Sequence, residues 1–235
     1  MKQIIILFLI GLTGLTSGQY VPYFLNIQSQ ADDLTRVIDA TLDNVRFAMS
    51  EELTAISKYL IYLTHDNLER IEVIQNRTET MIYDEDTVEE CATIVYQGWR
   101  ESIMETGASI SQCVVNINEK IAQKTSGLFK LISQAEELSM IFQNIVVNQL
   151  GLWNSVTDSD LLSYLIGTQV ENFRQYISIY VNGELGRGLE EIFALDAEVL
   201  PDASACLRNT VVHFNNIAQT IIDTLEICNE FSRKK

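Results

Sequence analysis

The sequence predicts an all-α fold: an antiparallel bundle of about five helices that begins with a long N-terminal helix and carries two disulfide cross-links. Turn-forming residues are scarce, because no proline lies between Pro22 and Pro201 and no glycine lies between Gly18 and Gly98. An all-β chain of many short strands needs far more of both. Apolar residues recur in steps of three and four over the first third of the chain, which is the helical period.

The segment 1–18 has the composition of a secretory signal peptide. Lys2 precedes an apolar run from Ile4 to Leu15, and small residues follow up to Gly18. The run is about 12 residues long, whereas a membrane-spanning helix needs about 20. We therefore expect cleavage after Gly18. We expect residues 19–235 to form a single helical domain that is secreted, extracellular and free of the membrane.

The helices are predicted in chain order from their apolar steps and their end signals. Residues 19–82 form a long helix, which either provides a coiled-coil-like seam or breaks once near Asn67. An acidic run then supplies a helix start in which Asp86 caps free amides and Glu89 reaches back. The other helices are expected at about 86–124, 128–150, 160–182 and 202–231, with turns around Gly127, Gly151, Gly186 and Gly188 and the fifth helix beginning after Pro201.

Four cysteines form two pairs with equal spacing, because Cys113 follows Cys91 at the same interval at which Cys228 follows Cys206. An even count in a secreted chain predicts two disulfides. Because this interval of about 22 residues spans about 33 Å along a helix, the two cysteines of one intact helix cannot bond to each other.

Two helices that run antiparallel join Cys91 to Cys228 and Cys113 to Cys206, the pairing we favour because long neighbouring helices in bundles usually run in opposite directions. A parallel pair joins Cys91 to Cys206 and Cys113 to Cys228. The third possibility, Cys91 to Cys113, needs the chain to fold back at the glycines between them.

No catalytic, cofactor-binding or metal site is predicted. His65 and His213 lack Cys or carboxylate neighbours at ligand spacing. The acidic cluster at 84–90 lacks the glycine and the alternation of a calcium loop. The segment 183–188 lacks the Lys-Ser or Lys-Thr of a phosphate cradle. One modification site is predicted, because Asn76 begins the glycosylation sequence Asn-Arg-Thr.

The helical chain and its cysteines resemble a known family. A signal peptide, an acidic helical chain and paired cysteines at 91, 113, 206 and 228 are similar to those of the secreted insect proteins with a TsetseEP domain, with residues 86–228 as the corresponding region. The resemblance implies an extracellular, gut-associated or immune-associated protein whose molecular activity is undefined. The Glu-Pro repeat tail of the family's namesake is absent from this sequence, so no function of that tail carries over.

The charge of the chain limits the classes of molecule that we expect it to bind. A formal net charge of −16 repels nucleic acid and anionic lipid, so neither is expected as a partner. We expect a non-enzymatic structural or interaction protein with a protein partner of unknown identity and no cofactor. The alternative is an extracellular carrier of a small lipophilic ligand, which needs an apolar interhelical cavity of about 300 Å³ or more.

Overall fold

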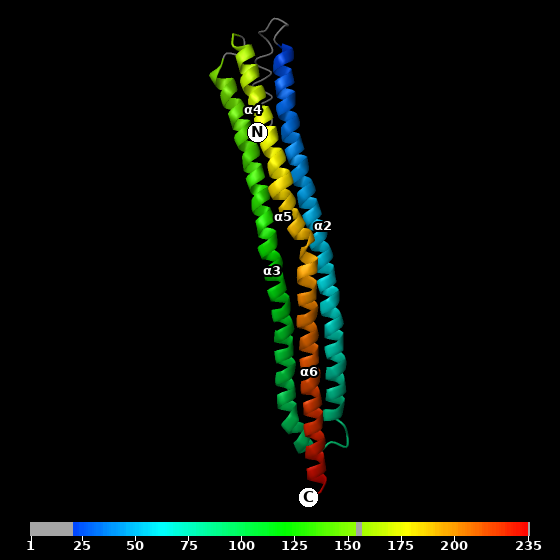
Figure 1. Ribbon diagram of the computed structural model, residues 1–235. Helices are drawn as coiled ribbons and strands as arrows, with labels where there is room; N and C mark the ends of the chain where they lie inside the picture. The colour runs from blue at the N-terminus through cyan, green and yellow to red at the C-terminus, as the bar shows by residue number, and fades with distance from the viewer. Residues whose placement is uncertain (1–20, 154–156, 235) are drawn as a thin grey trace. The chain divides into compact units, whose positions relative to one another are not determined.

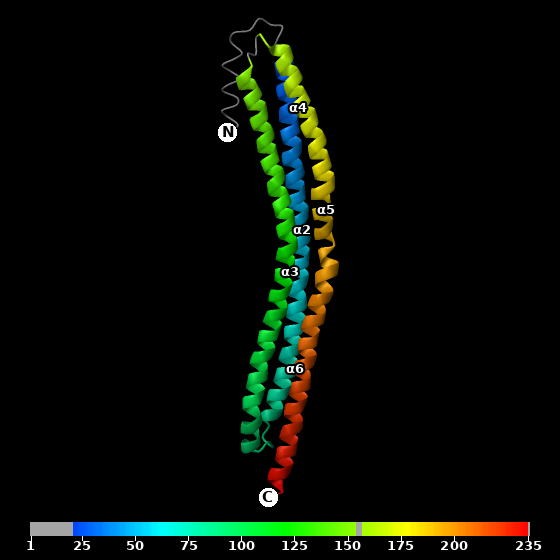
Figure 2. The same cartoon turned by 60° about the vertical axis from the view of Figure 1, so that its left-hand side comes forward.

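Three long helical segments make up the part of the chain that the computed structural model describes, residues 21–153 and 157–234 (Figure 1, Figure 2). The first is α2 (Val21–Ile82) and the second is α3 (Glu89–Leu152). The third is subdivided into α4 (Ser159–Tyr180), a π-helical stretch η1 (Val181–Leu185), α5 (Gly186–Phe193) and α6 (Leu195–Arg233). The predicted signal peptide, residues 1–18, lies outside the described residues.

The all-α class is confirmed, since these residues contain no β-strand. The expected number of about five helices was wrong, because segments predicted to be separate are continuous. The turn expected at Gly127 lies inside α3. Just before it, Thr125 is buried, and its hydroxyl donates to the carbonyl oxygens of Ile121 and Ala122. A single helical glycine costs about 1 kcal/mol, which does not end a helix whose neighbouring positions are packed.

The long first helix is also unbroken. Asn67 lies in the middle of α2 with 4% of its surface exposed, and its amide nitrogen donates to the carbonyl oxygen of Leu63 at 2.7 Å. This local bond satisfies the buried amide without opening the backbone, so the break that we considered near Asn67 does not occur.

The connection expected around the glycines of the third segment is helical as well. A Cβ atom added at Gly188 would lie 3.0 Å and 3.1 Å from the side chains of Leu128 and Leu131, so a larger residue there would have to displace these two leucines. Pro201 lies inside α6 instead of before it. The helix starts earlier because Leu195, Val199 and Ala203 pack into one apolar cluster with residues from α2 and α3.

The described residues divide into two compact units. Among the described residues, unit 1 comprises 21–49, 126–153 and 157–191, and unit 2 comprises 50–125 and 192–234. The single-domain organisation of 19–235 stays a prediction. None of the helices in the described ranges combines the length and the apolarity that a membrane-spanning segment needs.

Unit 1 is held by apolar and aromatic packing. Phe142 of α3 stacks on Phe173 of α4, with ring centroids 4.5 Å apart. The hydroxyl of Tyr180 donates to the carbonyl oxygen of Leu131 at 2.9 Å, and Arg46 pairs with Glu136. The fully buried side chains of the core include Ile38, Leu128, Leu162, Ile166 and Leu185.

Replacing Tyr180 tests the packing of unit 1. Tyr180→Phe removes the hydroxyl that bonds Leu131, so we expect the free energy of unfolding to fall by about 0.5–1.5 kcal/mol in thermal or urea denaturation. Burial raises the pKa of Tyr180. Above about pH 10 the unfolded tyrosine therefore ionises before the folded one, and stability falls as pH rises. Tyr180→Phe therefore loses less of its free energy of unfolding above about pH 10 than the unmodified chain does. Tyr164→Phe, at a side chain 71% exposed, is the control and should lose as much as the unmodified chain. Equal alkaline behaviour of the two variants contradicts the assignment.

Candidate functional site

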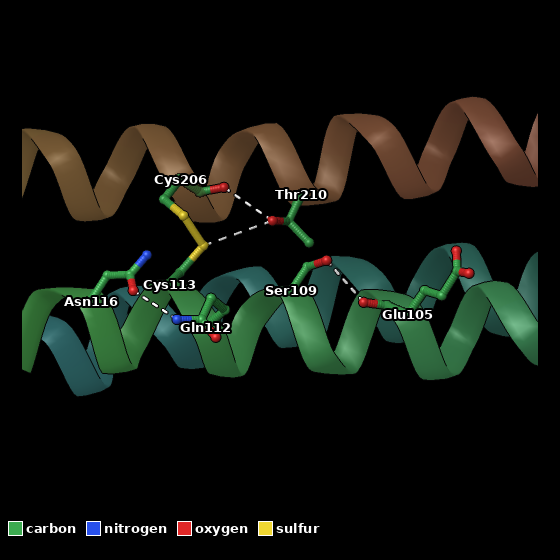
Figure 3. Close-up of a disulfide and its surroundings, with 7 residues drawn as sticks. All are labelled: Glu105, Ser109, Gln112, Cys113, Asn116, Cys206 and Thr210. Carbon is green, nitrogen blue, oxygen red and sulfur yellow. Dashed lines mark hydrogen bonds between the residues drawn. A yellow bond between two sulfur atoms is a disulfide. The ribbon is translucent and has the colours of Figure 1, made fainter.

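The four cysteines join α3 to α6 at two points of unit 2. Cys91 is bonded to Cys228 with Cα atoms 5.7 Å apart, and Cys113 is bonded to Cys206 with Cα atoms 5.9 Å apart. This is the antiparallel pairing that the spacing favoured, and neither the parallel pairing nor the pair within α3 is formed. In Figure 3, Cys113 and Cys206 reach toward each other between the two helices.

The equal spacing of the cysteines explains why both bridges form between the same two helices. The interval between the two cysteines of each helix equals two 11-residue repeats, and an 11-residue repeat has about 3.67 residues per turn. Positions separated by this repeat therefore return to the same face of the helix. In α3 the buried face carries Cys91, Ser102 and Cys113 at these intervals. Between the bridges, Trp99 stacks on Phe214 with ring centroids 5.0 Å apart, so an apolar contact fills the space that the bridges enclose.

The end of α6 caps the start of α3. The backbone N–H of Val88 donates to the side-chain oxygen of Asn229 at 3.0 Å, and the guanidinium of Arg233 donates to the carbonyl oxygen of Asp86 at 2.6 Å. The capping role that we expected Asp86 to play is thus filled from α6. The N–H of Asp86 instead donates to the carboxylate of Asp84 at 2.9 Å, which tightens the loop.

The cap from α6 can be tested by one substitution. Asn229→Ala leaves the N–H of Val88 without its acceptor, so we expect the free energy of unfolding to fall by about 0.5–2 kcal/mol, as for other lost helix caps. The measurement is urea denaturation of the disulfide-bonded chain. Asn215→Ala, at an exposed position of the same helix, is the matched control and should change the value by less than about 0.5 kcal/mol. A loss at Asn229 no larger than at Asn215 contradicts the capping role.

A groove of about 350 Å³ lies beside the Cys113–Cys206 bridge, between α3 and α6. Cys206 and Ile217 line it together with six residues that carry hydroxyl, amide, carboxylate or imidazole groups: Glu105, Thr106, Ser109, Asn209, Thr210 and His213. The hydroxyl of Thr210 lies 3.9 Å from the sulfur of Cys113 and donates to the carbonyl oxygen of Cys206 at 3.1 Å (Figure 3). The groove therefore opens this bridge to small molecules in solution.

The two bridges should differ in their rate of reduction. A thiolate must reach a sulfur atom to attack it. Each bridge joins a buried cysteine, Cys91 or Cys113, to a half-buried one, Cys228 or Cys206, so the difference between the bridges is the groove that Cys206 lines. We expect Cys113–Cys206 to be reduced first by a small thiol at neutral pH without denaturant. Alkylation at successive times and peptide mass mapping measure the order. Simultaneous loss of both bridges, or earlier loss of Cys91–Cys228, contradicts it.

The residues that we considered for metal or catalytic sites lie on exposed helix surfaces or in the α2–α3 loop. The expectation that the two histidines lack carboxylate neighbours was wrong. His65 pairs with Glu69 one turn further along α2, with 3.2 Å between the imidazole and carboxylate atoms, and His213 lines the groove together with Glu105. Within residues 21–153 and 157–234, no three side chains of the kinds that ligate metals come together. Asn76 is exposed on α2.

Sequence reasoning missed the groove, the cap from Asn229 and the contact between Trp99 and Phe214. Each of these joins residues that lie far apart in the chain, on two different helices. The equal spacing of the cysteines was the one signal that could relate α3 to α6.

Comparisons of the chain with protein-family models, with curated proteins and with solved structures find no match.

Proposed function

We propose that the chain is a secreted, non-enzymatic protein in which α2, packed on the disulfide-linked pair α3 and α6, presents exposed apolar side chains to a protein partner. The observation that carries the proposal is a run of large apolar side chains on the outside of α2. Within residues 59–73, five of them are between 46% and 70% exposed: Tyr59, Ile61, Tyr62, Leu68 and Val73. We call these five residues the α2 apolar run.

At about 100° per residue, Tyr59, Tyr62 and Val73 lie within about 60° of one another around α2, and Ile61 and Leu68 lie about 100° or more from them. Exposed apolar residues that occur singly are normal on a protein surface, so the stripe of three with the neighbouring pair is what we take as the contact surface. Tyrosine is enriched at protein interfaces because its ring adds apolar area and its hydroxyl adds a hydrogen bond. The α2 apolar run includes two tyrosines, Tyr59 and Tyr62. Covering these side chains removes apolar surface from water, which is the main favourable term in association.

Secretion is part of the proposal and rests on two features. The segment 1–18 has the composition of a signal peptide, and two disulfides of long span suit an oxidising compartment. Bridges that close loops of 93 and 137 residues contribute about 2–5 kcal/mol each, which favours persistence outside the cell. The resemblance to insect proteins with a TsetseEP domain, and with it a gut or immune role, remains a proposal that rests on the cysteine positions.

The carrier alternative has less support. The groove beside Cys113–Cys206 has sufficient volume for a small ligand, but six of the eight residues that line it carry hydroxyl, amide, carboxylate or imidazole groups. A lipophilic molecule that fills the groove covers these polar groups, which then lose their bonds to water.

Substitution within the α2 apolar run tests the interaction. The bait is the full-length secreted chain, immobilised and incubated with extracellular fluid from its source. Ile61→Glu combined with Tyr62→Glu places two charges in the run, so we expect loss of a partner that the unmodified chain retains in stoichiometric amount, at least about tenfold by quantitative mass spectrometry. Thr54→Glu combined with Ser57→Glu adds the same charge to exposed positions of α2 outside the run and should retain the partner. Equal retention by both double variants contradicts the assigned face, and recovery of small lipophilic molecules alone supports the carrier.

A further inference from the structure

We propose that Asn76 is glycosylated, and that the transfer takes place only before α2 packs against α3 and α6. The inference rests on the proposed secretion, because only a chain that enters the secretory compartment meets the enzyme. Asn76 is exposed and Thr78 completes its acceptor sequence, yet both lie within an unbroken helix. In the folded chain the acceptor sequence is therefore helical, and in this conformation the glycosyltransferase cannot bind it.

The first obstacle is the direction of the two side chains. An acceptor sequence that requires Ser or Thr two residues after Asn implies an enzyme that contacts both groups at once. In a helix, residues two apart point about 200° away from each other around the axis, whereas in extended backbone they point to the same side. Asn76 accordingly lies on the outside of α2, while Thr78 lies on its buried side with 0% of its surface exposed.

The second obstacle is that the hydroxyl of Thr78 and the backbone at Asn76 are already bonded within the helix. The hydroxyl of Thr78 donates to the carbonyl oxygen of Ile74 at 2.9 Å, and the hydroxyl of Thr80 donates to the carbonyl oxygen of Asn76 at 2.8 Å. Ile74 and Ile82, on either side of Thr78, pack in one cluster with Cys91 of α3 and Cys228 of α6. Exposing the hydroxyl of Thr78 to an enzyme requires the end of α2 to leave this cluster and unwind.

Synthesis provides an interval in which these obstacles are absent. Cys228 follows Thr78 by about 150 residues, so at about 5–20 residues per second it enters the compartment about 8–30 s later. Because most of the stability of a helix in a protein comes from tertiary packing, the end of α2 that carries Asn76 frays into extended backbone during this interval. Docking of α6 and closure of the Cys91–Cys228 bridge end the interval.

The transfer itself uses a lipid-diphosphate-linked oligosaccharide as donor. The amide nitrogen of Asn76 attacks the anomeric carbon of the first sugar, forming a carbon–nitrogen bond. The bond from that carbon to the diphosphate oxygen breaks, and the lipid diphosphate leaves with the electron pair. One amide proton passes to a base of the transferase. The chain contributes the acceptor alone, so its conformation decides whether the reaction occurs.

The experiment compares two states of the same unmodified chain. Chain purified with both bridges formed, and chain that has been reduced, alkylated and checked by circular dichroism for loss of helix, are each incubated with purified oligosaccharyltransferase and its lipid-linked donor. We expect the unfolded chain to be modified at least about tenfold faster, because the folded chain reacts only through rare local opening. Asn76→Gln and Thr78→Val should remove the signal in both states, and circular dichroism checks that Thr78→Val retains its helices. Equal rates for the two states, or an unmodified unfolded chain, overturn the proposal.

A second measurement separates this proposal from the proposed secretion. The chain is synthesised in the presence of microsomes, and removal of the signal peptide is scored on the same gel as the endoglycosidase-sensitive shift. We expect a cleaved and glycosylated product, with higher occupancy when a reductant prevents bridge formation. A chain that is cleaved but never modified overturns the glycosylation and leaves secretion standing. A chain that is neither cleaved nor modified overturns both.

Discussion

The alignment of α3 with α6 is the constraint on which unit 2 depends. Two bridges, placed at the same interval on each helix, fix both the direction and the offset of the pair. A slide of one helical turn, about 5.4 Å, would separate the partners at both bridges at once. The contact between Trp99 and Phe214 and the cap from Asn229 occur only at this offset. No disulfide reaches α2 among the described residues, so its place in unit 2 depends on the packing of its apolar side and on the loop that joins it to α3.

The sequence predicted correctly those features that appear as a periodic pattern within one helix. Steps of three and four along α2 reported which side is buried, and the equal cysteine spacing reported that two helices face each other over about six turns. Both patterns are periodic, so they can be recognised without knowing which other helices pack against the helix that carries them. The sequence Asn-Arg-Thr at 76–78 was equally visible, but the burial of Thr78 depends on α3 and α6 and could not be anticipated.

The number of helices was mispredicted for a common reason. Gly127 and Pro201 are weak local end signals, and each was overridden by burial of neighbouring residues: Thr125 and Leu128 around the glycine, Leu195 and Val199 before the proline. The groove and the cap from Asn229 lay beyond sequence reasoning for a different cause. Their residues belong to two helices far apart in the chain, and nothing in either helix alone indicates a hydroxyl or an amide that serves the other.

Each compact unit carries one of the two tryptophans, and their surroundings differ. Trp99 of unit 2 is fully buried against Phe214, whereas Trp153 of unit 1 is 39% exposed. Indole fluorescence moves to longer wavelength when water reaches the ring, so the two emit at different wavelengths in the folded chain. Loss of the short-wavelength component alone reports that unit 2 has opened. The chain therefore contains an intrinsic optical reporter that follows the disulfide-linked unit without any added label.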